Sequence, residues 1–226
     1  LFLGFILLIF VGAGLLMLPI ASTVETPFIK ALFTATSAVT VTGLVVLDTG
    51  THFTTFGQIV IAGLIQAGGL GFMTFAVVAA ISLGARLGLS QQILMKEALD
   101  QTSMEKVVQT AKFVLCYSFV IELVGFVLLT LVWLEEYGLR ESAYQAFFYT
   151  LSAFNNAGFA LRSDSLSAYS ASVSVNMIIT ALFIIGGIGF AVLIDIKTNE
   201  RWRKLSVNTR IVLLATLTIN LVAFFL

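Results

Sequence analysis

The sequence predicts an all-α membrane protein in which repeated units of helix, pore half-helix, filter loop and helix surround a pseudo-symmetric pore. Three observations predict this fold: an apolar composition, long apolar segments that alternate with short ones, and an internal repeat. Hydrophobic residues make up 59% of the 226 residues and charged residues 11%, against roughly 45–50% and about 25% in soluble domains. Because so apolar a chain cannot cover its surface with polar groups, we expect lipid to solvate much of it.

Charge and residue counts exclude several other classes. The formal net charge is zero and the mean hydropathy is +1.05, so no nucleic-acid partner is indicated. Cys116 is the single cysteine and has no partner for an intrachain disulfide. His52 has no ligand companions, so no metal site is expected other than one for a transported ion. With one histidine and one acid deep in an apolar segment, the chain is not expected to be an enzyme.

Five segments are long enough to span a membrane, which takes about 20 apolar residues: 1–20, 56–83, 107–134, 172–195 and 207–226. Two shorter stretches, Phe28 to Val39 and Ala143 to Phe154, lie between them. At 1.5 Å per residue each reaches only about 18 Å, short of a hydrocarbon core of about 30 Å. Each is either a helix on the external surface or, as we favour, a half-helix that enters the membrane and returns.

The distribution of basic residues predicts the orientation. The linkers 84–106 and 196–206 lie on the side that carries most of the lysines and arginines, and so are expected in the cytoplasm. The other side carries Lys30, Arg140 and Arg162. Residues 89–106 have an amphipathic pattern, which fits either a helix along the inner surface or a docking site for a soluble partner.

Two motifs occur twice, in the same order. The pattern Phe-x-x-x-Ser-Ala-x-x-x-x-Gly ends at Gly43 and again at Gly158, and Gly-Gly-x-Gly-Phe begins at Gly68 and again at Gly186. Such self-similarity indicates repeated structural units. We therefore divide the chain into a first repeat (1–83), a cytoplasmic linker (84–106), a second repeat (107–195), a second linker (196–206) and the first helix of a truncated third repeat (207–226).

The loops after the two half-helices are the candidate ion-binding sites. Backbone that leaves a helix has carbonyl oxygens without amide partners, and these can replace the hydration shell of a cation. Neither loop contains a carboxylate, which favours a monovalent ion over a divalent one. Ordinary buried turns are the alternative. The candidate residues are Thr40, Val41, Thr42 and Gly43 in the first loop and Asn155, Asn156, Ala157 and Gly158 in the second.

A series of small residues and one acid also stand out within the apolar segments. The spacing of Gly63, Ala67 and Gly71 predicts close packing between helices; the alternative is that these residues make the helix flexible. Glu122 lies well inside an apolar segment, where an acid usually faces the protein interior and finds a partner. Ser118 is a weak candidate partner, and both a structural hydrogen bond to loop backbone and a role in transport stay open.

At these loops the sequence resembles the Trk/Ktr/HKT superfamily of potassium transporters, and within it the KtrB-type membrane subunits. The resemblance covers essentially the whole chain and is carried by residues 32–44, 53–75 and 153–159. It implies a multi-pass protein of the bacterial plasma membrane that takes up potassium, with Gly43 and Gly158 at the filter and no organic cofactor. It also implies a homodimer and a cytosolic nucleotide-binding regulatory subunit of the KtrA/TrkA kind.

The chain departs from this family pattern in one respect. The resemblance implies four filter loops and a gating loop in the third repeat, and only two filter loops are present. We therefore expect these residues to be the N-terminal half of a longer pore-forming chain. Whether sodium is also required and whether flux is channel-like stay open. The alternative function is a non-conducting membrane scaffold or regulatory subunit with a pore-like fold.

Overall fold

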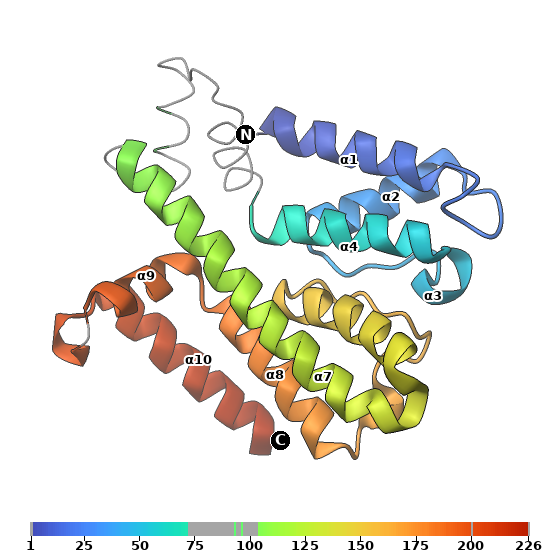
Figure 1. The fold of residues 1–226 in the computed structure, drawn as a ribbon. Helices are drawn as coiled ribbons and strands as arrows, with labels where there is room; N and C mark the ends of the chain where they lie inside the picture. Colours follow the sequence, from blue (N-terminus) through green and yellow to red (C-terminus); the bar gives the residue numbers. More distant parts are fainter. Residues whose placement is uncertain (1, 72–92, 94–95, 97–103, 200, 226) are drawn as a thin grey trace.

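The computed structural model describes residues 2–71, 93, 96, 104–199 and 201–225, and this part of the chain is built of helices (Figure 1). The first half contains α1 (Phe2–Leu16), α2 (Phe28–Val39), α3 (Thr49–His52) and α4 (Thr55–Gly69). The second half contains α7 (Met104–Phe154), the 3-10 turn η1 (Ser167–Tyr169), α8 (Val173–Gly187), α9 (Phe190–Thr198), η2 (Trp202–Lys204) and α10 (Val207–Phe225). The prediction of an all-α protein is confirmed.

The first half forms a three-helix unit in which α1, α2 and α4 pack against one another (Figure 1). The short helix expected from Phe28 to Val39 is present with those bounds. It begins after Pro27, whose φ of −60° suits the entry to a helix. The short helix α3 was not predicted; Asp48 caps it by accepting a hydrogen bond from the Thr51 amide at 2.8 Å.

The second short helix forms the last part of α7. Gly138, whose φ of 73° and ψ of 167° are not helical, separates this part from the long first part of α7. Across this break Ser142 Oγ donates to the carbonyl oxygen of Trp133 at 2.7 Å. The two expected segments, 107–134 and 143–154, therefore turn back on each other at this break (Figure 1).

The segment expected as one spanning helix over 172–195 is bent. Helices α8 and α9 meet at an angle of 84°. Gly189 lies between them with a φ of +91°, a left-handed conformation that ends the regular helix and that glycine adopts without steric cost. A hydropathy pattern records only that both helices are apolar, which is why it predicted a single straight segment.

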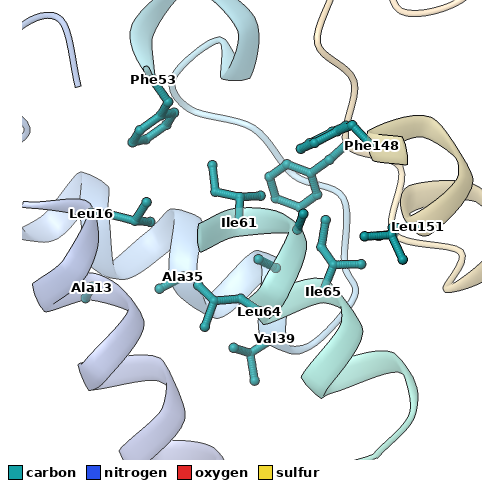
Figure 2. Packing of buried hydrophobic residues seen from close by; sticks show 14 of the residues in the cluster. Ala13, Leu16, Ala35, Val39, Phe53, Ile61, Leu64, Ile65, Phe148 and Leu151 are labelled. Carbon is teal, nitrogen blue, oxygen red and sulfur yellow. The ribbon is translucent and has the colours of Figure 1, made fainter. Parts of the chain in front are cut away.

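Two hydrophobic cores hold these units together. The first contains residues of α1, α2 and α4, and also Phe148 and Leu151 from the end of α7 (Figure 2). The second lies mainly between α7 and α8 and includes Trp133, which is 1% exposed. Because the end of α7 contributes to the first core, the two halves of the chain share one buried surface.

By length and apolarity, one described helix, Val107–Phe154, can cross a membrane, and the bent pair of α8 and α9 passes the same test as a single unit. Helices α1, α2, α4 and α10 are apolar but shorter. Residues 72–83, and most of the predicted amphipathic segment 89–106, lie outside the described residues.

Candidate functional site: two paired loops

The two predicted loops, here named loop 1 (Thr40–Gly43) and loop 2 (Asn155–Gly158), follow the same backbone path. In each, the third residue donates its amide to the carbonyl oxygen five residues earlier, at 2.9 Å in loop 1 and 2.7 Å in loop 2. The second residue donates to the carbonyl oxygen three residues earlier, at 3.2 Å and 3.0 Å. The repeat seen in the sequence is therefore also a repeat of hydrogen-bonded geometry.

Both loops enter the left-handed region twice, at matching positions. The second residues, Val41 and Asn156, have φ angles of +54° and +57°, and the glycines, Gly43 and Gly158, have +80° and +69°. A left-handed conformation costs a residue with a Cβ about 1–2 kcal/mol. Val41 is β-branched, so its positive φ marks a backbone that the surrounding packing holds in place.

In the part of the chain that the structure describes, the backbone oxygens of the two loops differ from those of the helices in having no amide partner. Among the described residues, none of the carbonyl oxygens in Thr40–Gly43 or Asn155–Gly158 accepts a hydrogen bond. Loop 1 also lies at the C-terminal end of α2, where the helix dipole presents roughly half a negative charge. Such an arrangement attracts a cation without a carboxylate.

The two loops meet at their glycines. A Cβ built on Gly158 would lie 3.5 Å from the Cα of Gly43, and one built on Gly43 would lie 2.7 Å from the carbonyl oxygen of Ala157. The tertiary structure thus brings together segments that are 115 residues apart in the sequence. A side chain at either position would enter the space between the loops.

In the repeated glycine motifs, one glycine packs the helix that follows each loop against the last residue of the helix that precedes it. A Cβ on Gly68 of α4 would lie 1.9 Å from the carbonyl oxygen of Val39, and one on Gly186 of α8 would lie 1.7 Å from that of Phe154. A Cβ on Gly63 or Gly71 would meet no described atom within 4 Å. The predicted close packing of helices is therefore found at Gly68, next to Ala67, and not at these two positions.

The loop side chains differ in exposure and in partners. Thr40 and Thr42 are exposed, and their hydroxyl oxygens are 2.6 Å apart. Asn155 is 8% exposed, and its Nδ2 donates to Leu151 O at 2.9 Å and to Gln66 Oε1 at 2.7 Å. Asn156 is exposed, whereas Ala157 is fully buried. The Asn155 side chain therefore braces loop 2 and does not point into open space.

Glu122 finds its partner on another helix. Gln66 Nε2 donates to both of its carboxylate oxygens, at 2.8 Å and 2.9 Å. Ser118 is not its partner: the Ser118 hydroxyl is buried and makes no hydrogen bond to a described residue. Sequence reasoning missed Gln66, and its place directly before Ala67-Gly68-Gly69 was the only available signal.

A polar cluster anchors the segment that follows loop 2. Arg162 Nη1 donates to Tyr137 Oη at 3.1 Å, and the hydroxyl oxygens of Tyr137 and Tyr169 are 2.7 Å apart. Arg162 also pairs with Asp164 at 3.1 Å, and this hydrogen bond lowers the pKa of the Asp164 carboxyl. These contacts tie the chain after Phe159 to the turn near Gly138.

His52 is engaged in a structural contact. Its Nε2 lies 2.9 Å from Thr26 Oγ1. Burial, and secondarily the positive charge of Lys30, lower the pKa of His52 below 6.5. In the described part of the chain, no three His, Cys, Asp or Glu side chains are grouped as a metal site would require.

Comparison with known proteins identifies the family. The TrkH family, described as cation transport protein, matches residues 4–226. The chain is 49% identical over 220 residues to Ktr system potassium uptake protein B of Bacillus subtilis, covering 97% of this chain and 49% of that protein. It is 44% identical over 220 residues to the Vibrio alginolyticus protein of the same name, covering 93% and 48%. It is 39% identical over 225 residues to potassium/sodium uptake protein NtpJ of Enterococcus hirae, covering 99% and 50%.

The chain spans about half the length of the curated relatives that it matches. The predicted resemblance to KtrB-type transporters is confirmed, and a family of cation transport proteins agrees with the expectation that the chain is not an enzyme. On the extent of the family match, the chain belongs to the TrkH family of cation transport proteins.

Proposed function

We propose that this chain contributes two of the loops of a selectivity filter through which a multi-pass protein takes up potassium across the bacterial plasma membrane. Loop 1 and loop 2 share one backbone geometry, and their glycines meet. This pairing is the observation that supports the proposal most strongly, because two unrelated turns have no reason to share the same hydrogen bonds and left-handed positions. The names of the relatives, potassium uptake proteins, support the choice of ion.

The ion is bound mainly by backbone oxygen. The carbonyl oxygens of Thr40–Gly43 and Asn155–Gly158 have no other partner among the described residues. Carbonyl oxygens can replace the hydration water of a monovalent cation and release it again, as conduction requires. Sodium is a second candidate ion, since one relative is named a potassium/sodium uptake protein.

In this proposal α2 and the end of α7 are pore half-helices that enter the membrane from the external side. Helix α2 has 12 residues, about 18 Å at 1.5 Å per residue, and non-helical backbone at membrane depth is tolerated only inside protein or beside a water-filled cavity. Lipid surrounds the remaining apolar surface. The linkers 84–106 and 196–206 face the cytoplasm.

The partners are proposed on the family pattern. We propose a homodimer whose cytoplasmic face binds a nucleotide-binding regulatory subunit of the KtrA/TrkA kind. The word "system" in the names of two relatives supports a multi-component assembly. The cytoplasmic linkers are the parts of this chain that such a subunit can reach.

Replacing Gly43 with Ser tests the proposal in the full natural polypeptide, expressed in a bacterial host that lacks its own potassium uptake. The serine Cβ would lie 2.7 Å from Ala157 O, at a φ of +80°. We expect slower uptake of rubidium-86, a potassium tracer, and weaker discrimination against sodium, whereas Gly14→Ser, which meets no atom within 4 Å, leaves both unchanged.

Two results would contradict the proposal. Unchanged flux and selectivity in Gly43→Ser would show that loop 1 does not contact the ion. A wild-type protein that reaches the membrane but transports no potassium would favour the non-conducting scaffold instead.

A further inference from the structure

The two loops are braced in different ways, although their backbones match. Thr40 of loop 1 bonds within its own unit, to Thr36 O at 2.8 Å and to the Thr42 hydroxyl at 2.6 Å. Asn155 occupies the equivalent position in loop 2 and bonds to Gln66 at 2.7 Å, on a helix of the other half of the chain. Loop 2 therefore has a side-chain hydrogen bond to the other half of the chain, whereas the side-chain hydrogen bonds of Thr40 to described residues stay within the first half.

Asn155 is held at two points of α4. Its Nδ2 donates to Gln66 Oε1, and its Oδ1 lies where a side chain at Gly69 would begin, 2.0 Å from a Cβ built there. Gln66 and Gly69 are one helical turn apart, so they present neighbouring positions on one face of α4. These two contacts on α4 fit the Asn155 side chain in one orientation, with its oxygen toward Gly69 and its nitrogen toward Gln66.

Glu122 fixes the orientation of Gln66. Both carboxylate oxygens of Glu122 accept from Gln66 Nε2, at 2.8 Å and 2.9 Å. Because Gln66 presents its nitrogen to Glu122, it presents its oxygen to Asn155. If the Gln66 amide turned over, its oxygen would face the carboxylate and its nitrogen would face the Asn155 nitrogen, and both hydrogen bonds would be lost.

The three side chains come from three separate elements: α7, α4 and loop 2. Glu122 is 8% exposed and Asn155 is 8% exposed, so water does not readily replace either partner. A buried polar group that loses its partner keeps the full cost of desolvation. Loss of either hydrogen bond in this series therefore leaves the Asn155 side chain of loop 2 without its fixed position.

We propose that Glu122 is a positioning residue for loop 2: through Gln66 it orients Asn155, and so holds the carbonyl oxygens of loop 2 at the cation site. The inference rests on the proposed function of the loops as an ion filter. Glu122 does not contact the ion in this role. It acts between the two halves of the chain, at the loop whose asparagine side chain bonds to α4.

The direct test compares Glu122→Leu with Glu122→Gln in the full natural polypeptide, by potassium uptake at matched amounts of protein in the membrane. Leucine has no acceptor, so we expect the KM for potassium to rise at least about tenfold, with weaker discrimination against sodium and a smaller change in maximal rate. Glutamine can offer its oxygen to Gln66 Nε2, so its KM is expected within about threefold of wild type.

A swapped pair provides the second test, in case Glu122→Leu does not reach the membrane. Gln66→Glu alone places two carboxylates together and is expected to impair uptake. The double variant Gln66→Glu with Glu122→Gln restores the chain of bonds, because the new carboxylate accepts from both Asn155 and the new amide. We expect its KM and its selectivity to return toward those of the wild type.

Gln58→Leu is the matched control. Gln58 is a glutamine on the same helix, 7% exposed; its Nε2 donates to Phe53 O at 2.8 Å, and its Oε1 accepts from the Tyr144 hydroxyl in the second part of α7. Its loss is expected to lower stability without changing ion selectivity, which separates a positioning role from a general effect of removing a buried amide.

The outcomes distinguish the two proposals. If the wild-type protein takes up no potassium, the proposed function fails. If the wild type takes up potassium and Glu122→Leu has the same KM and selectivity, the role of Glu122 fails while the filter stands. The role of Glu122 would also be contradicted if the double variant had the same KM and selectivity as Gln66→Glu alone.

Discussion

Gly43 and Gly158 face each other so closely that a Cβ built on Gly158 would lie 3.5 Å from the Cα of Gly43. The contact is not symmetric, because a Cβ on Gly43 would meet the carbonyl oxygen of Ala157 at 2.7 Å. The first distance is an ordinary contact between carbon atoms, and the second requires the loop to move. The two glycines therefore share a conformation but not the same freedom to accept a side chain.

Gly43→Ala is expected to impair potassium uptake more than Gly158→Ala. Both alanines would have a positive φ, at a cost of about 1–2 kcal/mol, but only the first also meets a backbone oxygen. Initial rates of rubidium uptake at matched expression measure the difference. Gly14→Ala, in helix α1 with open space around it, is the control. Equal losses at both loop positions would show that the conformation alone decides the effect.

Gly68→Ala is expected to destabilise the protein by about 1–3 kcal/mol through overpacking. Its Cβ would lie 1.9 Å from Val39 O, so α4 must move away from the end of α2. Gly63→Ala, on the same helix with no atom within 4 Å of its Cβ, is expected to keep or raise stability, since alanine is the better helix former.

The two variants are compared by their thermal unfolding midpoints in detergent. Gly186→Ala should behave like Gly68→Ala, because its Cβ would lie 1.7 Å from Phe154 O. A Gly68→Ala protein as stable as Gly63→Ala would contradict the assigned contact.

The stability of the loop region around His52 is expected to fall as the pH is lowered below 6.5. Burial, and then the charge of Lys30, lower the pKa of His52 in the folded protein below this ordinary value. The unfolded chain then binds a proton more readily than the folded one, so the His52 contribution is fully present above 6.5 and is lost as the pH falls through the folded pKa.

Unfolding in detergent between about pH 5 and about pH 8, the range in which histidine titrates, measures this effect. His52→Gln should flatten the dependence, and Lys30→Gln should move it toward higher pH. A pH profile that is the same in wild type and His52→Gln would exclude His52 as its source.

Ser206→Ala is expected to cost about 1 kcal/mol by loss of a helix cap. Ser206 Oγ accepts from the Thr209 amide at 3.2 Å at the start of α10, and the Ser206 amide donates to Asp195 Oδ2 at 2.9 Å. Thermal unfolding measures the change, and Ser206→Gly should cost only a few tenths of a kcal/mol. If alanine were as stable as serine, the hydroxyl would not act as a cap in solution.

Much of the helical fold could be predicted from local pattern. Residues 28–39 were expected as a short helix and form α2 with those bounds, and a proline directly precedes the segment. The bend between α8 and α9 was missed, since both helices are apolar and only the φ of +91° at Gly189 separates them. The glycine-rich stretch was expected to pack helices closely, and it does so at Gly68, against the end of α2.

The sequence by itself determined which segments are helical and apolar, and that the loops ending in Gly43 and Gly158 belong to a repeated motif. Those properties depend on residues close together in the chain, which a pattern of glycines and apolar residues records. Only the tertiary structure decided that the two loops meet, and that Glu122 reaches Asn155 through Gln66 at 2.8 Å and 2.7 Å. Gln66 and Asn155 are 89 residues apart in the chain, and contacts over such distances depend on how the helices pack, which no local pattern specifies.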